Sequence, residues 1–260
     1  MKMMEQKETK QILELIIKNM SGLKLKHWEK LIEPELAKLT DTERVLVIKH
    51  LKLGSNTELA ERQSDLIKRR VASAKFIRAQ TVDQYDFNYN PSTRQIKEPL
   101  MKINQLAREG TIPKVVLVGS TGLGKTHLAR SLGYTACQAG KTVLFIKAST
   151  IVNSLAMAKA TNTLESEIRR YRKPELLIID ELGYVTMDLE AGNLFFQVIS
   201  DRHDRGLGTI VTTNYAFGNW NQIFASESTA VVTVERLTAE AEVFYLEGES
   251  YPQYQKRKKK

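Results

Sequence analysis

The chain has very little cysteine and no pattern of residues that would build a metal cage. Cys137 is the only cysteine among 260 residues, which excludes an intrachain disulfide and a cysteine-based metal site. The four histidines, His27, His50, His127 and His203, are not spaced as metal ligands are. We therefore expect Cys137 to be a small buried hydrophobic residue.

Long apolar runs are also missing. No stretch approaches the ~20 apolar residues that cross a bilayer, and the segment Met1–Glu8 lacks the apolar core of a signal peptide. We expect a cytoplasmic protein that has no membrane partner.

The net charge is +9, and the excess of basic over acidic residues lies toward the two ends of the chain. Residues 1–95 hold 18 Lys and Arg against 13 Asp and Glu, and residues 96–255 hold 16 against 17. The five residues 256–260 are all basic. A polyanion such as DNA would explain this placement, because cationic side chains release counterions from phosphates. A solvated, disordered tail would explain the last five residues equally well.

The segment Val115 to Thr126 reads Val-Val-Leu-Val-Gly-Ser-Thr-Gly-Leu-Gly-Lys-Thr, an apolar strand that runs into a P-loop. Glycines in such a loop let backbone N–H groups approach phosphate oxygens. The Lys125 ammonium would reach the β- and γ-phosphates of ATP, and the Thr126 hydroxyl would ligate Mg²⁺. We assign nucleotide binding to nine consecutive residues, Gly119, Ser120, Thr121, Gly122, Leu123, Gly124, Lys125, Thr126 and His127.

Two other interpretations of the loop are weaker. A glycine-rich turn without a ligand would not need the strand before it or the helix expected from Lys125 to Ala139, which Gly140 would end. The dinucleotide fingerprint fits poorly, because His127 stands where its third glycine belongs.

A second candidate motif is Leu-Leu-Ile-Ile-Asp-Glu at 176–181, a short apolar strand that ends in two carboxylates. Asp180 would hold Mg²⁺, and Glu181 would activate the attacking water. An acidic pair after a strand is common in loops, so the assignment depends on the neighbouring P-loop. The glutamate also argues against a small-molecule kinase, which must avoid activating water.

Two further residues complete a candidate set for hydrolysis. Asn214 ends the β-branched strand Thr209–Thr213 and could hold water or the γ-phosphate, although an asparagine that begins a turn is nearly as good an interpretation. Arg236 is a candidate arginine finger, which would neutralise charge on the γ-phosphate of a neighbouring subunit. From spacing alone it could equally be a surface arginine.

Residues 1–80 are expected to form a small all-helical domain for interaction or oligomerisation. Thr40 and Glu43 have the spacing of a capping box, and the helix that follows should stop at Gly54. Asn56 could cap the next helix. A helix-turn-helix within this domain has only weak support.

Residues 81–95 are rich in aromatics and turn formers and predict a linker whose aromatics pack near the base pocket of the nucleotide domain. That domain is expected at 96–251, with a basic tail at 252–260. Strands predicted at 115–118, 142–146, 176–180 and 209–213 alternate with helices. This alternation indicates an α/β fold in which helices sandwich a parallel sheet.

Several dispersed stretches between Leu66 and Tyr251 also match the motifs of one family. They are Lys68-Arg-Arg, Tyr85-Asp-Phe87, Gly119 to Thr126, Leu176 to Tyr184, Val211 to Asn214 with Phe217 and Trp220, Glu235-Arg-Leu237 and Gly248-Glu-Ser-Tyr251. In these motifs the chain resembles the IstB-type helper ATPases of insertion sequences. These are relatives of the replicative helicase loader DnaC within the AAA+ superfamily.

The resemblance implies an ATP-hydrolysing AAA+ protein that uses Mg²⁺ and forms a homo-oligomer with ATP sites at subunit interfaces. Asn214 would match the first sensor of such proteins, and Arg236 the finger that completes a neighbour's site. The family binds duplex DNA in the ATP state, then recruits and stimulates a transposase. A helicase loader of the DnaC type is the alternative. The family commonly has arginine where this chain has Pro252, so any contact of that arginine is absent here or comes from the basic tail.

Overall fold

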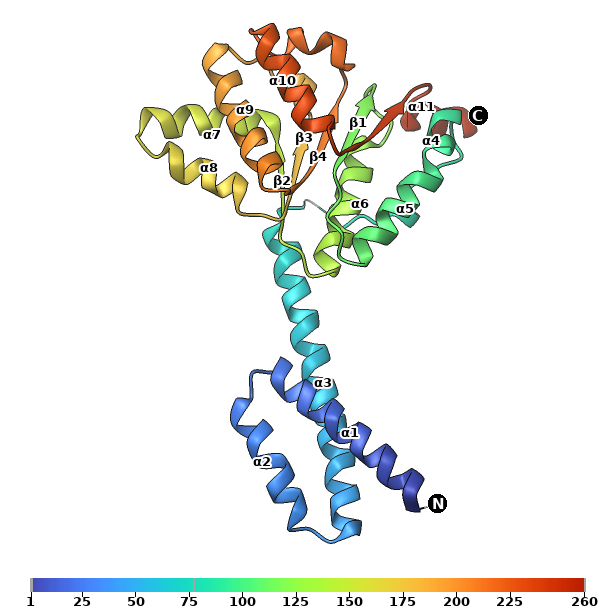
Figure 1. Ribbon diagram of the computed structural model, residues 1–260. Coiled ribbons are helices and arrows are strands. Elements are labelled where there is room, and N and C mark those ends of the chain that lie inside the picture. The colour runs from blue at the N-terminus through green and yellow to red at the C-terminus, as the bar shows by residue number, and fades with distance from the viewer. Residues whose placement is uncertain (1, 77, 260) are drawn as a thin grey trace. The chain divides into compact units, whose positions relative to one another are not determined.

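The computed structural model of the chain describes residues 2–76 and 78–259, and the chain divides into two compact units, Met1–Lys68 and Arg69–Lys260 (Figure 1). Met1, Ile77 and Lys260, which belong to the predicted N-terminal domain and basic tail, lie outside the described residues. Each unit has its own hydrophobic core and is described separately.

The second unit is built on a five-stranded parallel sheet in the order β2-β3-β4-β1-β5 (Figure 1). Its strands are β1 (Val115–Gly119), β2 (Val143–Lys147), β3 (Leu176–Asp180), β4 (Gly208–Thr213) and β5 (Glu242–Leu246). The four predicted strands and the parallel sheet are confirmed, with bounds that differ by at most one residue. The sequence did not predict β5, because this edge strand alternates exposed and buried residues and has no continuous apolar run.

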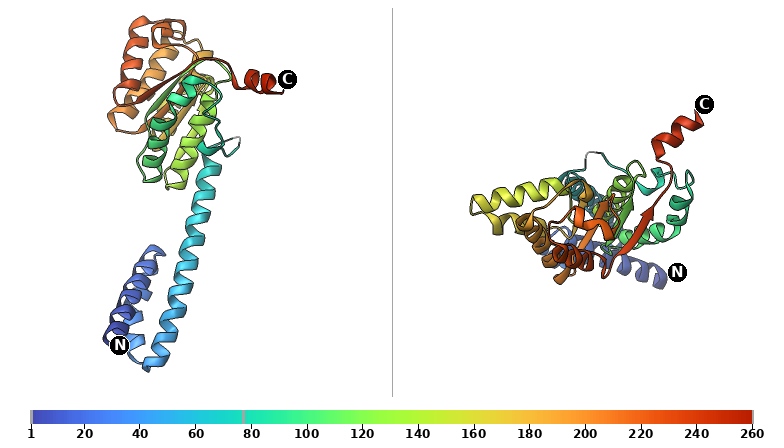
Figure 2. Two further views of the ribbon diagram at one scale, coloured as in Figure 1. Left: turned by 90° about the vertical axis from the view of Figure 1, so that its right-hand side faces the viewer. Right: turned by 90° about the horizontal axis from the view of Figure 1, so that it is seen from above.

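Helices cover both faces of this sheet, as predicted (Figure 2). Along β1, Val115 and Leu117 pack into the core beneath α5 and α6, whereas Val116 and Val118 pack into the core beneath α7, α9 and α10. The helices of this unit are α4 (Pro91–Gln95), α5 (Lys97–Arg108), α6 (Lys125–Gln138), α7 (Ala148–Ala160), α8 (Leu164–Arg172), α9 (Leu189–Asp204), α10 (Glu227–Thr238) and α11 (Tyr251–Lys258). Three short 3₁₀ turns complete it, η1 (Val82–Gln84), η2 (Leu182–Tyr184) and η3 (Phe217–Gln222).

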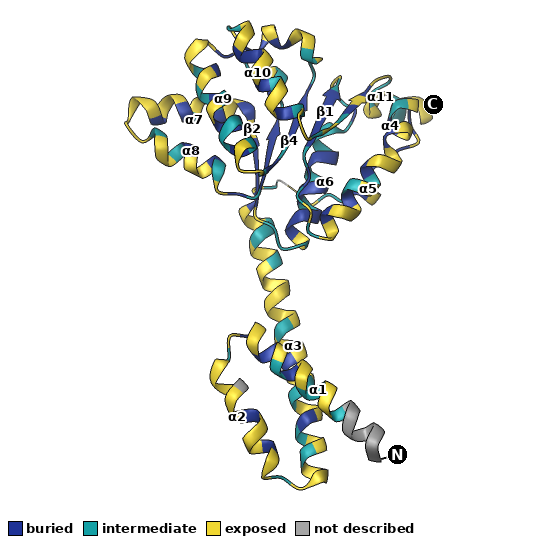
Figure 3. Ribbon diagram, viewed as in Figure 1, coloured by how far each residue is buried: buried dark blue, intermediate teal, exposed yellow. Residues whose placement is uncertain are grey.

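Strand β3 is the most deeply buried part of the sheet, and its neighbours β4 and β1 are buried along most of their length, as the dark blue of β1 in Figure 3 shows. All five residues of β3 are buried, including Asp180 at its end. A carboxylate in such a position must be hydrogen-bonded, because burial of an unpaired charge is costly. Strand β3 therefore brings a functional group to the carboxyl edge of the sheet on a rigid support.

The segment 81–95 packs as part of the second unit. Val82, Tyr85, Phe87 and Tyr89 are buried in the same core cluster as β1 and α6. This core explains why a segment without helical periodicity is rich in aromatics.

The first unit consists of α1 (Lys2–Gly22), α2 (Lys26–Ala37) and the greater part of α3 (Asp41–Ser73). Its core is a small cluster of side chains from the three helices, Ile16, Met20, Ile32, Leu36 and Ile48. Within residues 2–76 and 78–259, no helix has both the length and the hydropathy that a membrane span requires.

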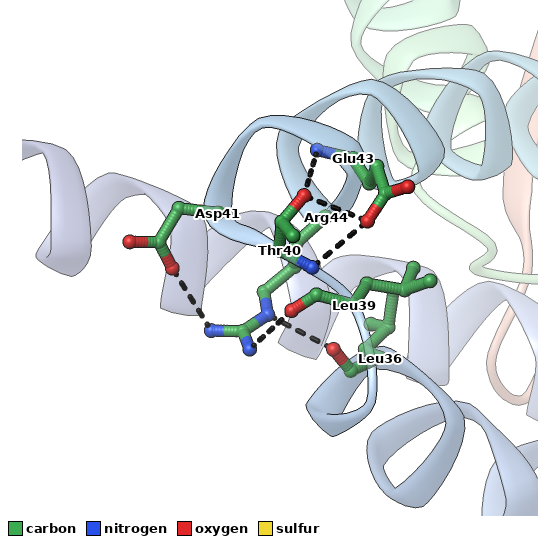
Figure 4. Close-up of polar contacts among 6 residues, drawn as sticks. All are labelled: Leu36, Leu39, Thr40, Asp41, Glu43 and Arg44. Carbon is green, nitrogen blue, oxygen red and sulfur yellow. Dashed lines mark hydrogen bonds and ion pairs between the residues drawn. The ribbon is translucent and has the colours of Figure 1, made fainter.

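The start of α3 confirms the predicted capping box (Figure 4). The Thr40 backbone N–H and hydroxyl both donate to Glu43 Oε2, at 3.0 and 2.7 Å, and the Glu43 N–H donates back to Thr40 Oγ1 at 3.4 Å. The hydrogen bond from the Thr40 hydroxyl, followed by the one from its backbone, holds the pKa of Glu43 below its usual value. Arg44, in the first turn of the helix, donates to the Leu36 and Leu39 carbonyls.

The predicted stop at Gly54 is wrong, because α3 continues through this residue to Ser73. A glycine inside a helix costs about 1 kcal/mol relative to alanine, which neighbouring contacts can offset. Here the Asn19 side chain of α1 donates to Ser55 Oγ at 3.2 Å and to Asn56 Oδ1 at 2.6 Å. Asn56, predicted to cap a new helix, instead ties α3 to α1.

Candidate functional site

One cleft opens at the carboxyl ends of β1, β3 and β4, and its space is about 670 Å³ with the solvent at its mouth included. Seven of the predicted site residues line it, Thr121, Gly122, Gly124, Lys125, Thr126, Glu181 and Asn214. Three more residues, Tyr184, Thr212 and Thr213, complete the lining.

The loop between β1 and α6 has the backbone that its glycines predict. Gly119, Gly122 and Gly124 all have positive φ, at 152°, 83° and 80°. A Cβ at Gly119 would lie 2.1 Å from the Leu246 carbonyl oxygen, and a Cβ at Gly124 would lie 2.4 Å from the Tyr85 ring. Side chains at these positions are therefore excluded by the conformation and by close packing, and the loop leaves its N–H groups open to an anion.

Lys125 lies at the start of α6 with its ammonium turned back over the loop. Its Nζ donates to the Gly119 carbonyl at 2.5 Å and to the Ser120 carbonyl at 2.7 Å. Burial lowers the pKa of Lys125, and the charge of Asp180 opposes this shift. A phosphate in the loop would offer the same ammonium a charged partner in place of two neutral carbonyls.

Asp180 is the centre of a hydrogen-bond network that joins α6, β3 and β4. Its Oδ1 accepts from the Thr126 hydroxyl at 2.8 Å and from the Thr212 hydroxyl at 2.6 Å. Thr212 Oγ1 in turn accepts from the Glu181 N–H at 2.9 Å. The predicted residues Thr126 and Asp180 are thus brought together, and Thr212 is a linking residue that the sequence interpretation missed.

These oxygen atoms suit Mg²⁺. This ion prefers carboxylate and hydroxyl oxygens and keeps several waters, so that one or two protein ligands and phosphate oxygens complete its shell. Asp180 is only 1% exposed, so its charge is held in a poorly solvated position where a cation is favourable. Thr126 and Asp180 therefore have the chemistry expected of magnesium ligands.

The position of the Glu181 side chain is set by an unusual backbone conformation and by an ion pair. Its φ is 62°, an unusual left-handed conformation for a residue other than glycine. Its Oε2 lies 2.8 Å from the Lys147 ammonium at the end of β2. The hydrogen bond to Glu181 raises the pKa of Lys147. The exposed lysine thus restrains the position of the Glu181 carboxylate.

Asn214 follows β4 and lines the same cleft. Its Oδ1 is buried and has no hydrogen-bond partner among the described residues. A Cβ at Gly183 would lie 1.7 Å from this oxygen, so only glycine fits beside it. This contact explains why glycine stands between Leu182 and Tyr184, which the sequence alone did not show.

Tyr184, like Thr212 and Thr213, lines the cleft although the sequence interpretation gave it no role. Its hydroxyl makes a hydrogen bond with Thr121 Oγ1 in the P-loop. The side chain is 61% exposed, and it borders the cleft from η2. Its place at the end of the motif stretch Leu176 to Tyr184 is the sequence signal that could have pointed to it.

Four predicted nucleotide-binding residues do not line the cleft, Gly119, Ser120, Leu123 and His127. The Ser120 carbonyl accepts from Lys125, and the fully buried Leu123 accepts at its carbonyl from the hydroxyls of Tyr85 and Tyr89, at 2.7 and 3.1 Å. The ring of His127 packs against Tyr85 with centroids 5.6 Å apart, and its Nε2 lies 3.0 Å from the Thr81 carbonyl.

Arg236 lies at the opposite edge of the sheet. Near the end of α10, it borders a small pocket together with Lys114, which precedes β1, and Thr209, near the start of β4. Its Nη1 is 3.7 Å from Asp204 Oδ1, and its side chain is 43% exposed. It cannot reach the cleft of its own chain, so the predicted role in a neighbour's site stays a prediction.

Comparison with known families and curated proteins gives a consistent result. A sequence model described as IstB-like ATP binding protein matches residues 18–259. The putative ATP-binding protein of insertion sequence IS232 from Bacillus thuringiensis subsp. berliner is 35% identical over 197 residues, which cover 76% of this chain and 78% of that protein. The corresponding protein of IS5376 from Geobacillus stearothermophilus is 36% identical over 202 residues, which cover 77% and 78%.

Solved structures with the same fold are replication proteins. A crystal structure of the DnaC helicase loader superposes with a TM-score of 0.55 at 19% identity and covers 69% of this chain and 99% of that one. AMPPCP-bound DnaA from Aquifex aeolicus gives a TM-score of 0.55 at 16% identity and covers 68% and 53%. These similarities establish the fold of the second unit, an α/β P-loop ATPase fold that resembles those of DnaC and DnaA.

Proposed function

Because this chain belongs to the IstB-like ATP binding protein family, we propose that it hydrolyses Mg²⁺-bound ATP while assembled on duplex DNA, and that the assembly recruits and stimulates a transposase. Hydrolysis, DNA binding and the transposase are parts of this proposal that experiments must test separately. The relatives are ATP-binding proteins of insertion sequences, which is the reason for naming a transposase as the partner.

The observation that best supports ATP hydrolysis is the hydrogen-bond network around Asp180. Two hydroxyls fix its Oδ1, and one of them, from Thr212, also fixes the backbone of Glu181. The candidate metal ligand and the candidate base are therefore held by the same threonine. Positioning of this kind is the main source of catalysis in phosphoryl transfer.

Each residue then has a chemical role. A bound Mg²⁺ would bridge phosphate oxygens and neutralise their developing charge. Lys125 would add a second positive charge at the β- and γ-phosphates, and Glu181 would accept a proton from the attacking water. The side-chain amide of Asn214, which lines the cleft, would orient that water.

Arg236 would act in the cleft of a second copy. Its exposed position and the 3.7 Å separation from Asp204 leave the guanidinium free to reorient toward a partner. An arginine supplied to a neighbouring γ-phosphate would couple hydrolysis to assembly. The proposed active form is therefore a homo-oligomer with ATP sites between subunits.

The helical first unit would supply contacts with other proteins. It exposes large apolar side chains, among them Trp28 at 50% and Leu53 at 67% of their surface. Exposed apolar groups of this size support a role in interaction or oligomerisation. Since these relatives come from bacteria and the proposed partner is DNA, the expected compartment is the cytoplasm.

The direct test compares duplex and single-stranded DNA as ligands in the presence of ATP, ADP or no nucleotide. The proposal predicts preference for duplex DNA, ATP-dependent assembly on it and stimulation of a transposase encoded by the same element. Preference for single strands, with binding to a replicative helicase, would instead support the alternative of a DnaC-type loader.

A further inference from the structure

We propose that helix α11 binds the phosphate backbone of duplex DNA and that its hydrogen bond to the P-loop links DNA affinity to the bound nucleotide. This inference rests on the proposed DNA-bound ATPase, and it identifies the surface of the second unit that would contact DNA.

The first observation is charge. Helix α11 and its C-cap present Lys256, Arg257, Lys258 and Lys259, all exposed, and the segment 250–259 contains no acidic residue. Only one of these cations has a carboxylate partner in the described residues, the pair of Arg257 with Glu249 at 3.1 Å. Residues 96–255 are nearly neutral, with 16 basic and 17 acidic side chains. From residue 96 onward, the excess positive charge of the described residues is therefore concentrated on one short helix and its C-cap.

The second observation is that this helix is attached firmly to the ATPase unit. Figure 2 shows α11, in red, projecting from that unit next to the C-terminus. The Tyr254 ring packs against Tyr89 with centroids 5.8 Å apart, and Tyr251 packs against Tyr89 at 5.2 Å. The cations Arg257 and Lys258 lie 5.8 and 6.0 Å from the Tyr254 ring. An ordered cationic helix loses less entropy on binding a polyanion than a flexible tail does.

The third observation is the attachment point. The Tyr251 N–H donates to the Gly122 carbonyl at 2.9 Å, and a Cβ at Gly122 would lie 2.9 Å from Ser250 Cβ. The next loop residue, Leu123, accepts at its carbonyl from Tyr89, the ring on which α11 packs. The helix thus contacts the loop that would wrap the phosphates of ATP.

The linkage follows from this geometry. A nucleotide that changes the position of Gly122 changes the position of Tyr251 and the cations that follow it. If two ligands favour the same arrangement, each raises the affinity of the other by the same factor. Pro252, which stands where the family commonly has arginine, lies 3.5 Å from a Cβ at Gly122 and adds to this packing.

Duplex DNA is the partner that the charge favours. Each phosphate contact on duplex DNA contributes roughly 0.9 to the slope of log affinity against log salt. Three side chains of α11 would therefore account for a slope of up to about 2.7. An acidic segment of a protein partner is the competing occupant, and the test must distinguish the two.

The first experiment uses the full chain and a charge-neutralised variant, K256Q/R257Q/K258Q. A matched control, K97Q/K102Q/R108Q, removes the same charge from exposed positions of α5. Duplex DNA binding is measured with ATP at several salt concentrations, together with ATP binding. We expect the α11 variant to lose at least about tenfold in DNA affinity and roughly 2 units of salt slope, whereas the control should lose much less.

The outcomes separate the inference from the proposed function. If the wild-type chain does not bind duplex DNA, the proposed function is wrong. If the wild-type chain binds and the α11 variant binds with equal affinity and slope, the inference alone is wrong. Unchanged DNA binding with lost stimulation by a transposase would assign the helix to a protein partner and would also contradict the inference.

The second experiment tests the linkage through the Tyr251 N–H. Proline is tolerated at the first position of a helix, and Ser250 before it already has an extended backbone with ψ of 149°. Tyr251→Pro removes the ring and the donor, whereas Tyr251→Ala removes only the ring. We expect the ratio of DNA affinities with ATP and ADP to be about fivefold or more in the wild-type chain. It should be retained better by the alanine variant than by the proline variant, and equal ratios in the two variants would contradict the linkage.

Discussion

The two edges of the parallel sheet hold their functional residues in different ways. At the carboxyl edge, Thr126 and Thr212 fix the Asp180 carboxylate through bonds of 2.8 and 2.6 Å. At the amino edge, Arg236 is half-exposed, and its ion pair with Asp204 is 3.7 Å long. A group that acts within its own chain is positioned by buried hydrogen bonds, whereas a group that acts on another copy must stay free to move. The comparison predicts that a substitution at the carboxyl edge impairs ATP hydrolysis in the chain that carries it. A substitution of Arg236 at the amino edge should instead impair hydrolysis in the neighbouring chain.

The largest effect is expected at the carboxyl edge, for Lys125→Ala. Loss of the charge that faces the phosphates should abolish ATP binding, and hydrolysis is then lost with it. Titration with a fluorescent ATP analogue measures this loss, and Lys102→Ala, an exposed lysine of α5, is the control. Equal affinity in the Lys125 variant and the wild-type chain would contradict the assignment of the cleft.

The next effect tests the amino edge. Arg236→Ala should leave ATP binding intact and slow hydrolysis by about 10³-fold, the lower end of the range for an arginine finger. Mixing this variant with the Lys125→Ala variant should restore part of the activity, because one chain then offers an intact cleft and the other an intact arginine.

Arg205→Ala is a suitable control for this experiment, because Arg205 is an exposed arginine just after α9. If the mixture has no more activity than its components, Arg236 does not act between copies, and the contrast between the two edges is lost.

Glu181→Gln separates binding from chemistry at the carboxyl edge. Loss of a general base typically costs about 10²- to 10⁴-fold in rate, while the neutral side chain should still allow ATP binding. The variant should therefore accumulate as an ATP-bound assembly on duplex DNA, which sedimentation would detect. Normal turnover would refute the role of Glu181.

Gly183→Ala should give the smallest effect and tests the placement of Asn214. The added methyl group would lie 1.7 Å from Asn214 Oδ1 and must displace the amide. We expect hydrolysis to fall by about tenfold, with little change in ATP affinity. Gly218→Ala is the matched control, because a Cβ there meets nothing within 4 Å. Equal rates for the two variants would show that the amide position is unimportant.

The carboxyl edge could be predicted from sequence to a large extent. The amino-acid sequence of the P-loop determines the backbone conformation of the loop, since the left-handed conformations at Gly122 and Gly124 follow from the residue type. The strand before Asp180 is a continuous apolar run, which is the clearest local signal that a buried strand gives. These elements are determined by interactions between residues close together in the sequence, and their predicted bounds agree with the structure to within one residue.

What the sequence did not predict depends on contacts between distant segments. Thr212 joins Asp180 and Glu181 only because β4 pairs with β3, and nothing in its local sequence marks it as functional. Gly54 resembles a helix stop, but a contact from Asn19, far away in sequence, keeps α3 continuous. Likewise, the edge strand β5 lacks an apolar run because one of its sides is open to solvent.

The most direct test of the account is equilibrium binding of ATP to the wild-type chain, followed by phosphate release when Mg²⁺ and duplex DNA are added. The account predicts saturable binding near one ATP per chain and release that requires Mg²⁺ and increases with DNA. A wild-type chain that binds no adenine nucleotide under these conditions would contradict it.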